Sequence, residues 1–445
     1  MIQQKLLPIK LEKSDEEVTS RSGLILFDEF IKAFGLKRGL ARRMPLPGSN
    51  RGFEAWRYIE PLVLMLYGGG RHIEDLRELR EDRALMGATQ MGEIPSSSAY
   101  GDWLLRMGDG QGLVLFHRVI DELTRKVLRR DEHKEYTLWS DPTIIEADKH
   151  EAVMSYQGVK GYRPIVTAFK EMPVVVWHRF RPGNAMGGAL DALKGAYRLL
   201  PSGKRIKHAA LDSEFYTADV INYVRSEGTA FTIVADKDEA VVGAIGAIAE
   251  GDWRPYFDKD GVKTDREIAV TVHCMEKTEA FSLVVLRWSN RQRDLFRGDE
   301  YCYHAIATEL EVEPEEAIVQ HQESHPEQAF VWRYNERGQM ENIIKELKVG
   351  MGMEQMPSGS FEANAMYFAI GVLAYNLYVA QKYFVIGEGY QKKTIHTLRW
   401  SLIQIPGKLI SHGGRLILKI AATVEKFDHY MRMRQRHLAL LLEPG

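Results

Sequence analysis

The first 130 residues place apolar side chains three and four positions apart, which is the spacing of an amphipathic helix. Between residues 24 and 34, for example, Leu24, Phe27, Ile31 and Phe34 would share one face. Residues 95–98 read Pro-Ser-Ser-Ser, a typical N-cap cluster for the helix that follows. We therefore predict helices at 23–35, 54–67, 72–85, 99–107 and 112–130, with a basic loop rich in Pro and Gly at 37–52.

From residue 136 the pattern changes to the alternation of apolar and polar positions that is typical of strands. Helical spacing returns at 185–200, where Asn184 is a candidate cap, and at 217–226. The expected strands are 137–147, 163–169, 172–180, 208–215 and 230–236. Three strands, a helix, a strand, a helix and a strand follow one another in the order of the ribonuclease-H-like fold, an α/β fold with a mixed sheet and helices on both faces. A helix that carries an acidic residue completes that fold.

The expected last helix does not follow at once. Residues 238–325 contain further strand-like runs and predict a β-rich insertion, and helices are expected at 334–348 and 362–383. After them, 402–421 and 427–442 have the pattern of amphipathic helices. The predicted organisation is a helical N-terminal domain (1–130), a ribonuclease-H-like core in two parts (131–237 and 326–385) separated by the insertion (238–325), and a basic helical C-terminal region (386–445).

The composition is that of an ordinary soluble protein, with 445 residues, 45% of them hydrophobic and 27% charged. The two cysteines, Cys274 and Cys302, are too few for a disulfide framework and indicate a reducing compartment. Residues 1–17 lack the apolar core of a signal peptide. The apolar run Ala365–Ala380 is short for a membrane span and contains Asn376, which favours a buried helix. We expect a cytoplasmic protein.

Charge is unevenly distributed, although the formal net charge is only −2. Residues 391–445 hold ten Lys and Arg against three acids, and residues 32–57 hold seven against Glu54 alone. Basic ends around an acidic middle suit a protein that binds phosphates at its ends and cations at its centre. Charge that only aids solubility is the alternative. The short N-terminal helices likewise fit a helix-turn-helix DNA reader or a plain helical bundle, and the flanking arginines favour DNA contact.

One stripe of the helix expected at 334–348 carries unusual chemistry. Tyr334, Arg337, Glu341 and Lys348 fall within an arc of roughly 60° at about 100° per residue. A carboxylate can bind a divalent metal, and the flanking cations can neutralise phosphates. A surface helix with ion pairs between neighbouring turns is the structural alternative.

The spacing Tyr-x2-Arg-x3-Glu-x6-Lys resembles the signature of the DDE transposases of bacterial insertion sequences. The resemblance implies that Glu341 is the third of three catalytic carboxylates. The blocks GVKGYRP (158–164) and LDSEFYT (211–217) also resemble that family, so the likeness extends over residues 137–348.

The other two acids of the pattern are Asp141, in the first strand, and Asp212, at the end of the fourth. Neighbouring strands in this fold would place them side by side, with Glu341 reaching them from its helix. Three carboxylates could bridge two Mg²⁺ ions, with Mn²⁺ as a substitute. Pro142 is unusual in a central strand because it lacks an N–H for the ladder. We interpret six nearby acids as solvated: Glu146, Asp148, Glu214, Asp236, Asp238 and Glu346.

Six further side chains are candidate DNA contacts: Tyr334, Arg337, Lys345, Lys348, Lys160 and Arg163. For Tyr334 the alternative is packing, and for Lys345 it is an ion pair with Glu341. Trp253 and Trp288 in the insertion could stack on a flipped base, although core packing is the more frequent role of a tryptophan.

The predicted function is transposition. The protein would bind terminal inverted repeats, hydrolyse a phosphodiester at each end of the element and direct the freed 3′-hydroxyl into target DNA. The resemblance implies cut-and-paste movement, and the need to cut two ends together implies a homodimer on DNA. The alternatives are a ribonuclease-H-like nuclease without strand transfer and a DNA-binding protein that has lost catalysis.

Overall fold

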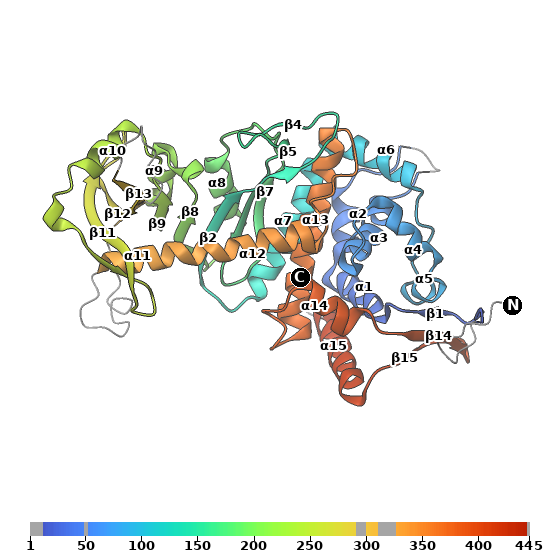
Figure 1. Ribbon diagram of the computed structural model, residues 1–445. Helices are drawn as coiled ribbons and strands as arrows, with labels where there is room; N and C mark the ends of the chain where they lie inside the picture. The colour runs from blue at the N-terminus through green and yellow to red at the C-terminus, as the bar shows by residue number, and fades with distance from the viewer. Residues whose placement is uncertain (1–11, 49–51, 291–299, 310–325, 443–445) are drawn as a thin grey trace, which may run out of the picture. The chain divides into compact units, whose positions relative to one another are not determined.

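The computed structural model describes residues 12–48, 52–290, 300–309 and 326–442 of the chain (Figure 1). Its contacts divide the chain into two compact units. One contains residues 104–380, and the other joins the N-terminal 103 residues to residues 381–445. This differs from the predicted organisation, because the two ends of the chain share one unit and the long helix at 111–130 belongs with the core.

The core of residues 104–380 is built on the predicted sheet. Five of its strands lie in the order β7-β6-β2-β8-β9. The central strand β2 is antiparallel to β6 and parallel to β8, which is in turn parallel to β9. These are the order and directions of the ribonuclease-H-like fold, which confirms the predicted fold class. The strand bounds are Glu135–Pro142 (β2), Ile165–Phe169 (β6), Val175–Arg179 (β7), Arg205–Leu211 (β8) and Ala230–Val234 (β9).

Pro142 fits into β2 because it is the last residue of the strand. The ladder with β8 ends at Ser140 opposite Leu211, so the missing N–H of Pro142 falls beyond it. Inside the strand, the Ser140 hydroxyl pairs with that of Thr167 at 2.7 Å, which satisfies two buried polar groups.

The insertion is β-rich, as predicted, but it extends the sheet of the core. Its strands are antiparallel neighbours, and β13 pairs with β9 through Ile306 opposite Val234. The sheet thereby has nine strands among the described residues, in the order β10-β11-β12-β13-β9-β8-β2-β6-β7. The inserted elements are α10 (Glu239–Gly246), β10 (Arg254–Phe257), β11 (Lys263–His273), β12 (Phe281–Ser289) and β13 (Tyr301–Thr308).

Helices cover this sheet, and α11 and α12 run along it in front of β2 and β8 in Figure 1. The long helix α13 protects the edge strand β7, because Asn376 accepts from the Val175 N–H and donates to its carbonyl, both at 2.8 Å. Helix α8 begins later than predicted, after Gly188 rather than Asn184. The bounds are Gln111–Arg130 (α7), Ala189–Leu199 (α8), Ala218–Ser226 (α9), Pro326–Asn335 (α11), Met340–Lys345 (α12) and Phe361–Gln381 (α13).

Residues 361–386 form a helix that is long and apolar enough to cross a membrane by length and composition. Its most apolar window is entirely buried inside the structure, which is the packing of a core helix. The predicted buried helix around Asn376 is therefore present and longer than expected.

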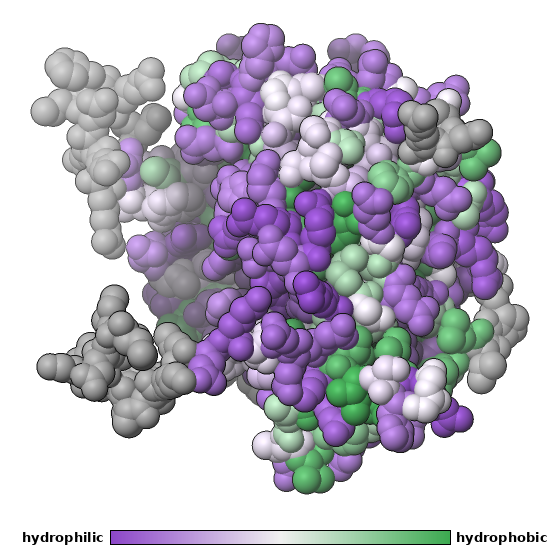
Figure 2. All heavy atoms as spheres, turned by 90° about the vertical axis from the view of Figure 1, so that its right-hand side faces the viewer, coloured by the Kyte–Doolittle hydropathy of each residue, from purple (hydrophilic) through white to green (hydrophobic). Residues whose placement is uncertain are grey.

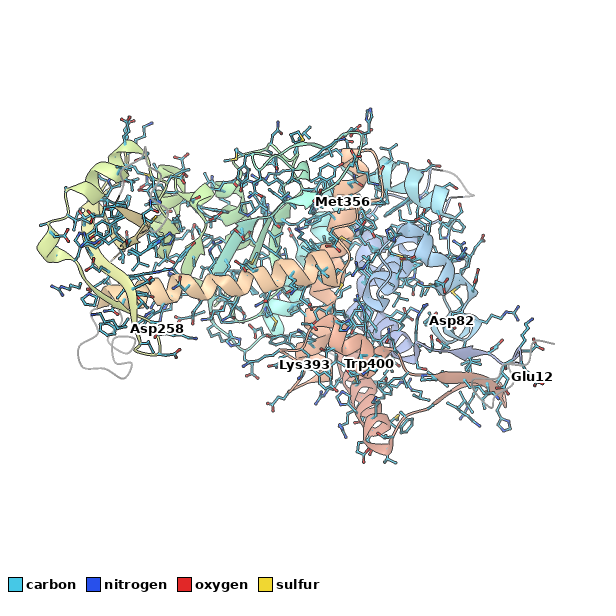
Figure 3. All side chains as sticks on the ribbon, viewed as in Figure 1. Glu12, Asp82, Asp258, Met356, Lys393 and Trp400 are labelled. Atoms are coloured by element: carbon cyan, nitrogen blue, oxygen red, sulfur yellow. The ribbon has the colours of Figure 1, made fainter. Side chains whose placement is uncertain are left out.

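The second unit combines N-terminal helices with C-terminal elements. Helices α1 and α15 pack together, and Arg434 of α15 pairs with Glu29 of α1 at 2.8 Å. Asp82, labelled in Figure 3, caps α5 and also accepts from the Thr19 hydroxyl of the short strand β1 (Val18–Thr19). The main helices are α1 (Ser22–Phe34), α2 (Leu36–Arg43), α3 (Ala55–Gly68), α4 (Leu76–Glu81), α5 (Arg83–Thr89), α6 (Ser97–Gly108) and α15 (Val424–Leu442).

Three predictions for this unit are wrong in part. Residues 37–43 are helical rather than a loop, and the helix expected at 72–85 is broken near Asp82. Residues 402–421 are not one helix, because β14 (Gly407–His412) and β15 (Arg415–Ile420) form a hairpin with Gly413 and Gly414 at its turn. Both glycines have positive φ, which this type of turn requires.

The second unit also leaves part of α15 uncovered. Phe427, Met431, Leu438 and Leu441 are exposed on that helix, while Tyr430, Met433 and Leu440 are buried. Hydrophobic side chains are visible in the lower part of Figure 2, at the height of α15 in Figure 1.

Candidate active site

The parallel pairing of β2 with β8 brings two of the predicted acids to the same end of the sheet. Ser140 is opposite Leu211, and Asp141 and Asp212 follow these residues directly. Side chains that follow neighbouring parallel strands meet at the carboxyl edge of the sheet, where open α/β folds form their ligand crevices.

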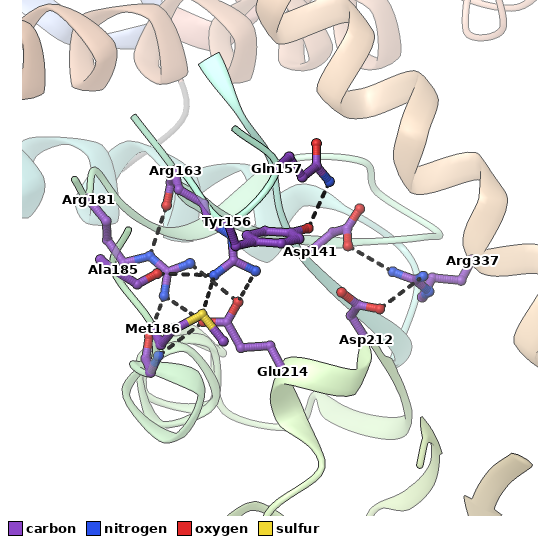
Figure 4. A network of polar contacts seen from close by, with 11 residues as sticks. Asp141, Tyr156, Gln157, Arg163, Arg181, Ala185, Met186, Asp212, Glu214 and Arg337 are labelled. Atoms are coloured by element: carbon purple, nitrogen blue, oxygen red, sulfur yellow. Dashed lines mark hydrogen bonds and ion pairs between the residues drawn. The ribbon is translucent and has the colours of Figure 1, made fainter. Parts of the chain in front are cut away.

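One guanidinium joins the two aspartates (Figure 4). A nitrogen of Arg337 lies 3.0 Å from a carboxylate oxygen of Asp141, and a second nitrogen lies 3.6 Å from one of Asp212. The three side chains keep 19–30% of their surface exposed, so the cluster is sheltered but open to solvent. In the structure Arg337, a predicted DNA contact, binds the acids themselves.

Burial and charge set the ionisation of this cluster. Burial raises the pKa of Asp141 to about 6; Arg337 opposes that rise, and the negative charges of Asp212 and Glu341 add to it. Burial lowers the pKa of Arg337, but Tyr334, Asp141 and Asp212 outweigh it and raise that pKa overall. At neutral pH the cluster therefore holds more negative than positive charge, which favours a further cation.

Glu341 approaches the aspartates from a helix whose winding changes. A 3₁₀ turn, Glu336–Gln339, separates α11 from α12, and a π turn, Glu346–Gly350, follows α12. Glu341 is exposed in the first turn of α12, one turn beyond Arg337. Its charge reaches Asp141, yet within the described ranges no three acidic, His or Cys side chains are grouped closely enough to hold a metal. The structure thus brings two of the three predicted acids together and leaves Glu341 at the edge of the group.

The donors that are present suit a hard divalent cation. Carboxylate oxygens are the ligands that Mg²⁺ prefers, and the Arg337 guanidinium already stands as a positive charge between two of them. The residues that would hold the metal are Asp141, Asp212 and Glu341. Glu341 follows the 3₁₀ turn Glu336–Gln339, and 3₁₀ turns within helices often mark hinges.

The remaining signature residues are tied to the scaffold. Lys348 donates to the Ile144 carbonyl at 2.6 Å, just beyond β2, and burial lowers its pKa. Tyr334 is 8% exposed and packs with Tyr256, Ile268 and Val331. Of the two roles considered for Tyr334, the structure shows packing, with its ring also under the Arg337 guanidinium at 5.3 Å.

Lys345 and Lys160, two other predicted DNA contacts, are placed differently. Lys345 is exposed on α12. Lys160 lies on the short strand β5 (Lys160–Tyr162), where it pairs with exposed Asp148 at 2.8 Å. Both side chains are therefore accessible to a ligand.

Arg163 has an internal role that the sequence did not reveal. Its guanidinium lies 2.8 Å from Glu214, and Arg181 binds the other oxygen of the same carboxylate at 2.7 Å (Figure 4). These three side chains are only 4–7% exposed. The interpretation of Glu214 as a solvated acid is therefore wrong. Two buried arginines fix it two residues after Asp212.

Other acids that we set aside also have definite partners. Asp238 caps α10 through the Val241 N–H, and Glu346 accepts from the Tyr378 hydroxyl. Asp236 is exposed after β9, yet burial and the charges of Asp212 and Asp238 raise its pKa against a hydrogen bond from Ser213 that lowers it. Asp236 thus belongs to the electrostatic surroundings of the site. Its position after β9, a strand parallel to β8, is the sequence feature that could have placed it near Asp212.

The two insertion tryptophans lie beneath arginines. The Arg287 guanidinium is 4.2 Å from the Trp253 ring centre, and that of Arg266 is 4.9 Å from Trp288. Arg287 is itself buried and paired with Glu250 and Glu267. These contacts stabilise the insertion sheet, which is the packing role considered for the tryptophans.

Comparison with known proteins identifies the family of this chain. Residues 3–440 match the family model described as Transposase DDE domain group 1. The chain belongs to this family. Its predicted relationship to the DDE transposases is thereby confirmed, while an origin in a bacterial insertion sequence stays a prediction. No curated protein sequence matches the chain.

A solved structure is similar to most of this transposase. It is described as "Cryo-EM structure of piggyBac transposase synaptic complex with hairpin DNA". The two chains are 11% identical, the similarity covers 96% of this chain and 83% of that one, and the TM-score is 0.44.

Proposed function

We propose that this transposase moves a bacterial insertion sequence by metal-dependent cleavage and strand transfer. It binds the terminal inverted repeats, cleaves a phosphodiester at each end and joins the freed 3′-hydroxyl to target DNA. It does so as a homodimer on DNA, in the bacterial cytoplasm at the nucleoid. Membership of a DDE transposase family supports the reaction class, and the paired aspartates support the site.

The observation that carries the proposal is the shared edge of β2 and β8. Asp141 and Asp212 meet there with a surplus of negative charge, and Arg337 connects them to the helix that bears Glu341. Mg²⁺ beside a phosphate is usually bound through one or two carboxylates, and this pair can supply them. When bound, two Mg²⁺ ions supply an activated oxygen nucleophile and stabilise the leaving oxygen.

The residues of the chain have separate roles in this proposal. Asp141 and Asp212 hold the metal ions from the rigid sheet, and Glu341 completes the ligand set from its helix. Once metal ions balance the acids, Arg337 is available to a phosphate oxygen of the DNA, as arginines commonly are. Lys345, which is exposed, and Lys160, which is partly exposed, contact the flanking DNA backbone.

The test is a reaction with the full chain, Mg²⁺ and DNA that carries the inverted repeat found beside its gene. Cleavage is measured at the repeat end, and joining is measured to a target plasmid. Replacing Asp141→Asn or Glu341→Gln should lower cleavage by roughly a thousandfold, because each removes a metal ligand worth several kcal/mol. Asp191→Asn is the matched control, since that acid is exposed and pairs with the exposed Arg179, which has no role in the proposal.

Two results would contradict the proposal. Cleavage that survives in both variants would separate these acids from catalysis. Cleavage without joining, at any target concentration, would leave a nuclease in place of a transposase that completes strand transfer.

A further inference from the structure

Two exposed apolar side chains, Tyr156 and Met186, lie against the Arg163–Glu214 pair, and a third, Met154, lies two residues before Tyr156 in the chain. Met154 and Tyr156 belong to the hairpin of β4 (Val153–Met154) and β5, and Met186 lies in the loop before α8. They are 56%, 69% and 69% exposed. Tyr156 and Met186 both contact Arg163, at 5.0 Å from ring centre to guanidinium carbon and 3.0 Å from sulfur to nitrogen. Exposed apolar groups gathered in this way often mark a binding surface.

Tyr156 is held in place although it is exposed. The turn that carries it closes through the Ser155 N–H to the Val159 carbonyl at 2.8 Å, with Gly158 at φ 74°. The Gln157 amide donates to the Tyr156 hydroxyl at 2.9 Å. A ring on a closed turn loses little further entropy when a ligand stacks on it.

The support under the ring is a buried cation. Arg163 is fixed by Glu214 and by the Ala185 carbonyl, which accepts from it at 3.0 Å. The guanidinium covers one face of Tyr156, and the large exposed fraction of the ring leaves the other face open. The Tyr156 ring is therefore a flat, exposed aromatic surface that is supported by a buried ion pair.

This surface is linked to the catalytic acids by a short series of contacts. Tyr156 contacts Arg163, Arg163 pairs with Glu214, and Glu214 lies in the 3₁₀ turn that starts directly after Asp212. Figure 4 shows Tyr156, Glu214 and the two aspartates within one close-up view.

We propose that Tyr156, mounted on Arg163 and Glu214, is the surface on which one nucleobase of the DNA strand in the active site stacks. The inference rests on the proposed function, because it takes the ligand of the aspartates to be DNA. Positive charge next to an aromatic ring is the usual combination for holding a single nucleic-acid strand, and Lys160 on the same hairpin adds to that charge. Stacking on a ring tolerates any base, so Tyr156 holds the strand without reading its sequence.

The experiment places 2-aminopurine, a fluorescent base, at successive positions around the cleavage site of the inverted-repeat DNA. Fluorescence and binding anisotropy are measured with the full chain, so neither readout depends on cleavage. Tyr156→Ala should remove the fluorescence change at one position and weaken DNA binding by roughly fivefold to a hundredfold. Tyr156→Phe keeps the ring and should behave as the unaltered protein. Val272→Ala removes an equally exposed apolar side chain, on β11, and serves as the control.

The outcomes separate the two proposals. Equal fluorescence and affinity in Tyr156→Ala and the unaltered protein would overturn the stacking role. So would a loss of self-association in Tyr156→Ala without any change in DNA binding, because the side chain would then belong to a protein interface. If the protein binds DNA and stacks a base on Tyr156 but does not cleave the DNA, the stacking role is supported and the proposed catalytic function is contradicted.

Discussion

Two clusters of carboxylates and arginines are neighbours in the core, because Asp212 belongs to one and Glu214 to the other. They differ in their balance of charge and in their exposure to solvent. At the edge formed by β2 and β8, Asp141 and Asp212 share the cation Arg337, and all three side chains are partly exposed. Beside it, Glu214 alone balances Arg163 and Arg181, and all three are nearly inaccessible.

The difference shows how one segment can combine a binding site with its support. An excess of carboxylate that faces solvent is accessible to a cation from solution, as the proposed function requires. An excess of guanidinium that is buried needs other acceptors, and the Arg163, Ala185 and Gly187 carbonyls provide them. Removing one partner of a buried charge cluster leaves the others uncompensated. Because its ion pairs are costly to break, the buried cluster fixes the segment after Asp212. The side chains of the exposed cluster can change partners at a lower cost.

A third cluster, in the other unit, also has two carboxylates and one cation, but its acids are buried. Lys32 lies 2.6 Å from Asp28 and 3.1 Å from Glu60, and both acids are almost fully buried. Here burial and the charge of Glu60 raise the pKa of Asp28 to about 8, although Lys32 lowers it, so protonation of Asp28 reduces the excess negative charge.

The largest effect is expected from Glu214→Gln. This change keeps the shape of the side chain but leaves two buried arginines without a counter-charge, so it should lower the free energy of unfolding by about 3–5 kcal/mol. Urea denaturation measures the loss. Asp191→Asn breaks the exposed Arg179–Asp191 pair instead and should cost about 1 kcal/mol or less. Equal losses in the two variants would contradict the distinction between buried and exposed clusters.

An intermediate effect is expected from Arg337→Ala, which leaves Asp141 and Asp212 facing each other. The pKa of Asp141, raised to about 6 in the intact site, should rise further. A raised folded-state pKa means that folding takes up a proton, so the stability of the variant should fall as pH increases from about 4 through this value. We expect a loss of roughly 1–2 kcal/mol at pH 8 and a smaller one at pH 5.

Magnesium gives the control for this variant. Thermal unfolding at pH 8 should show that Mg²⁺ stabilises Arg337→Ala more than it stabilises the unaltered protein, because the ion replaces the missing positive charge. Arg179→Ala, which removes an exposed arginine, should show no such difference. Identical responses to Mg²⁺ would mean that Arg337 does not occupy the position of a metal charge.

The smallest effect is expected from Asp28→Asn, which leaves Lys32 paired one to one with Glu60. Between the ordinary pKa of 3.8 and the folded value near 8, Asp28 gains a proton on folding, so its contribution to stability falls as pH rises through that window. The variant should lose this dependence and unfold roughly 2–4 °C higher at pH 8. Melting curves from pH 6 to pH 8.5 measure it, and a parallel decline in both proteins would show that Asp28 is ionised when folded.

The sequence determined much of the core by itself. The alternation at 137–147 predicted a strand that contains Asp141, and the apolar run before Asp212 predicted a strand that ends at this acid. The order of strands and helices predicted that the two strands are neighbours. Such patterns are local, because the period of two or of 3.6 residues follows from backbone geometry. The hairpin at 407–420 could also have been predicted, since Gly413-Gly414 between two apolar runs is a turn signal.

Only the tertiary structure decided how charged side chains pair. The helical stripe grouped Arg337 with Glu341, but the structure turns Arg337 towards Asp141 and Asp212, which lie 196 and 125 positions earlier in the chain. Glu214 looked like any solvated acid until Arg163 and Arg181 were placed around it, and the union of the two chain ends in one unit had no local pattern. The physical reason is that an ion pair depends on distances between segments remote in sequence, and no periodicity within one segment encodes those distances.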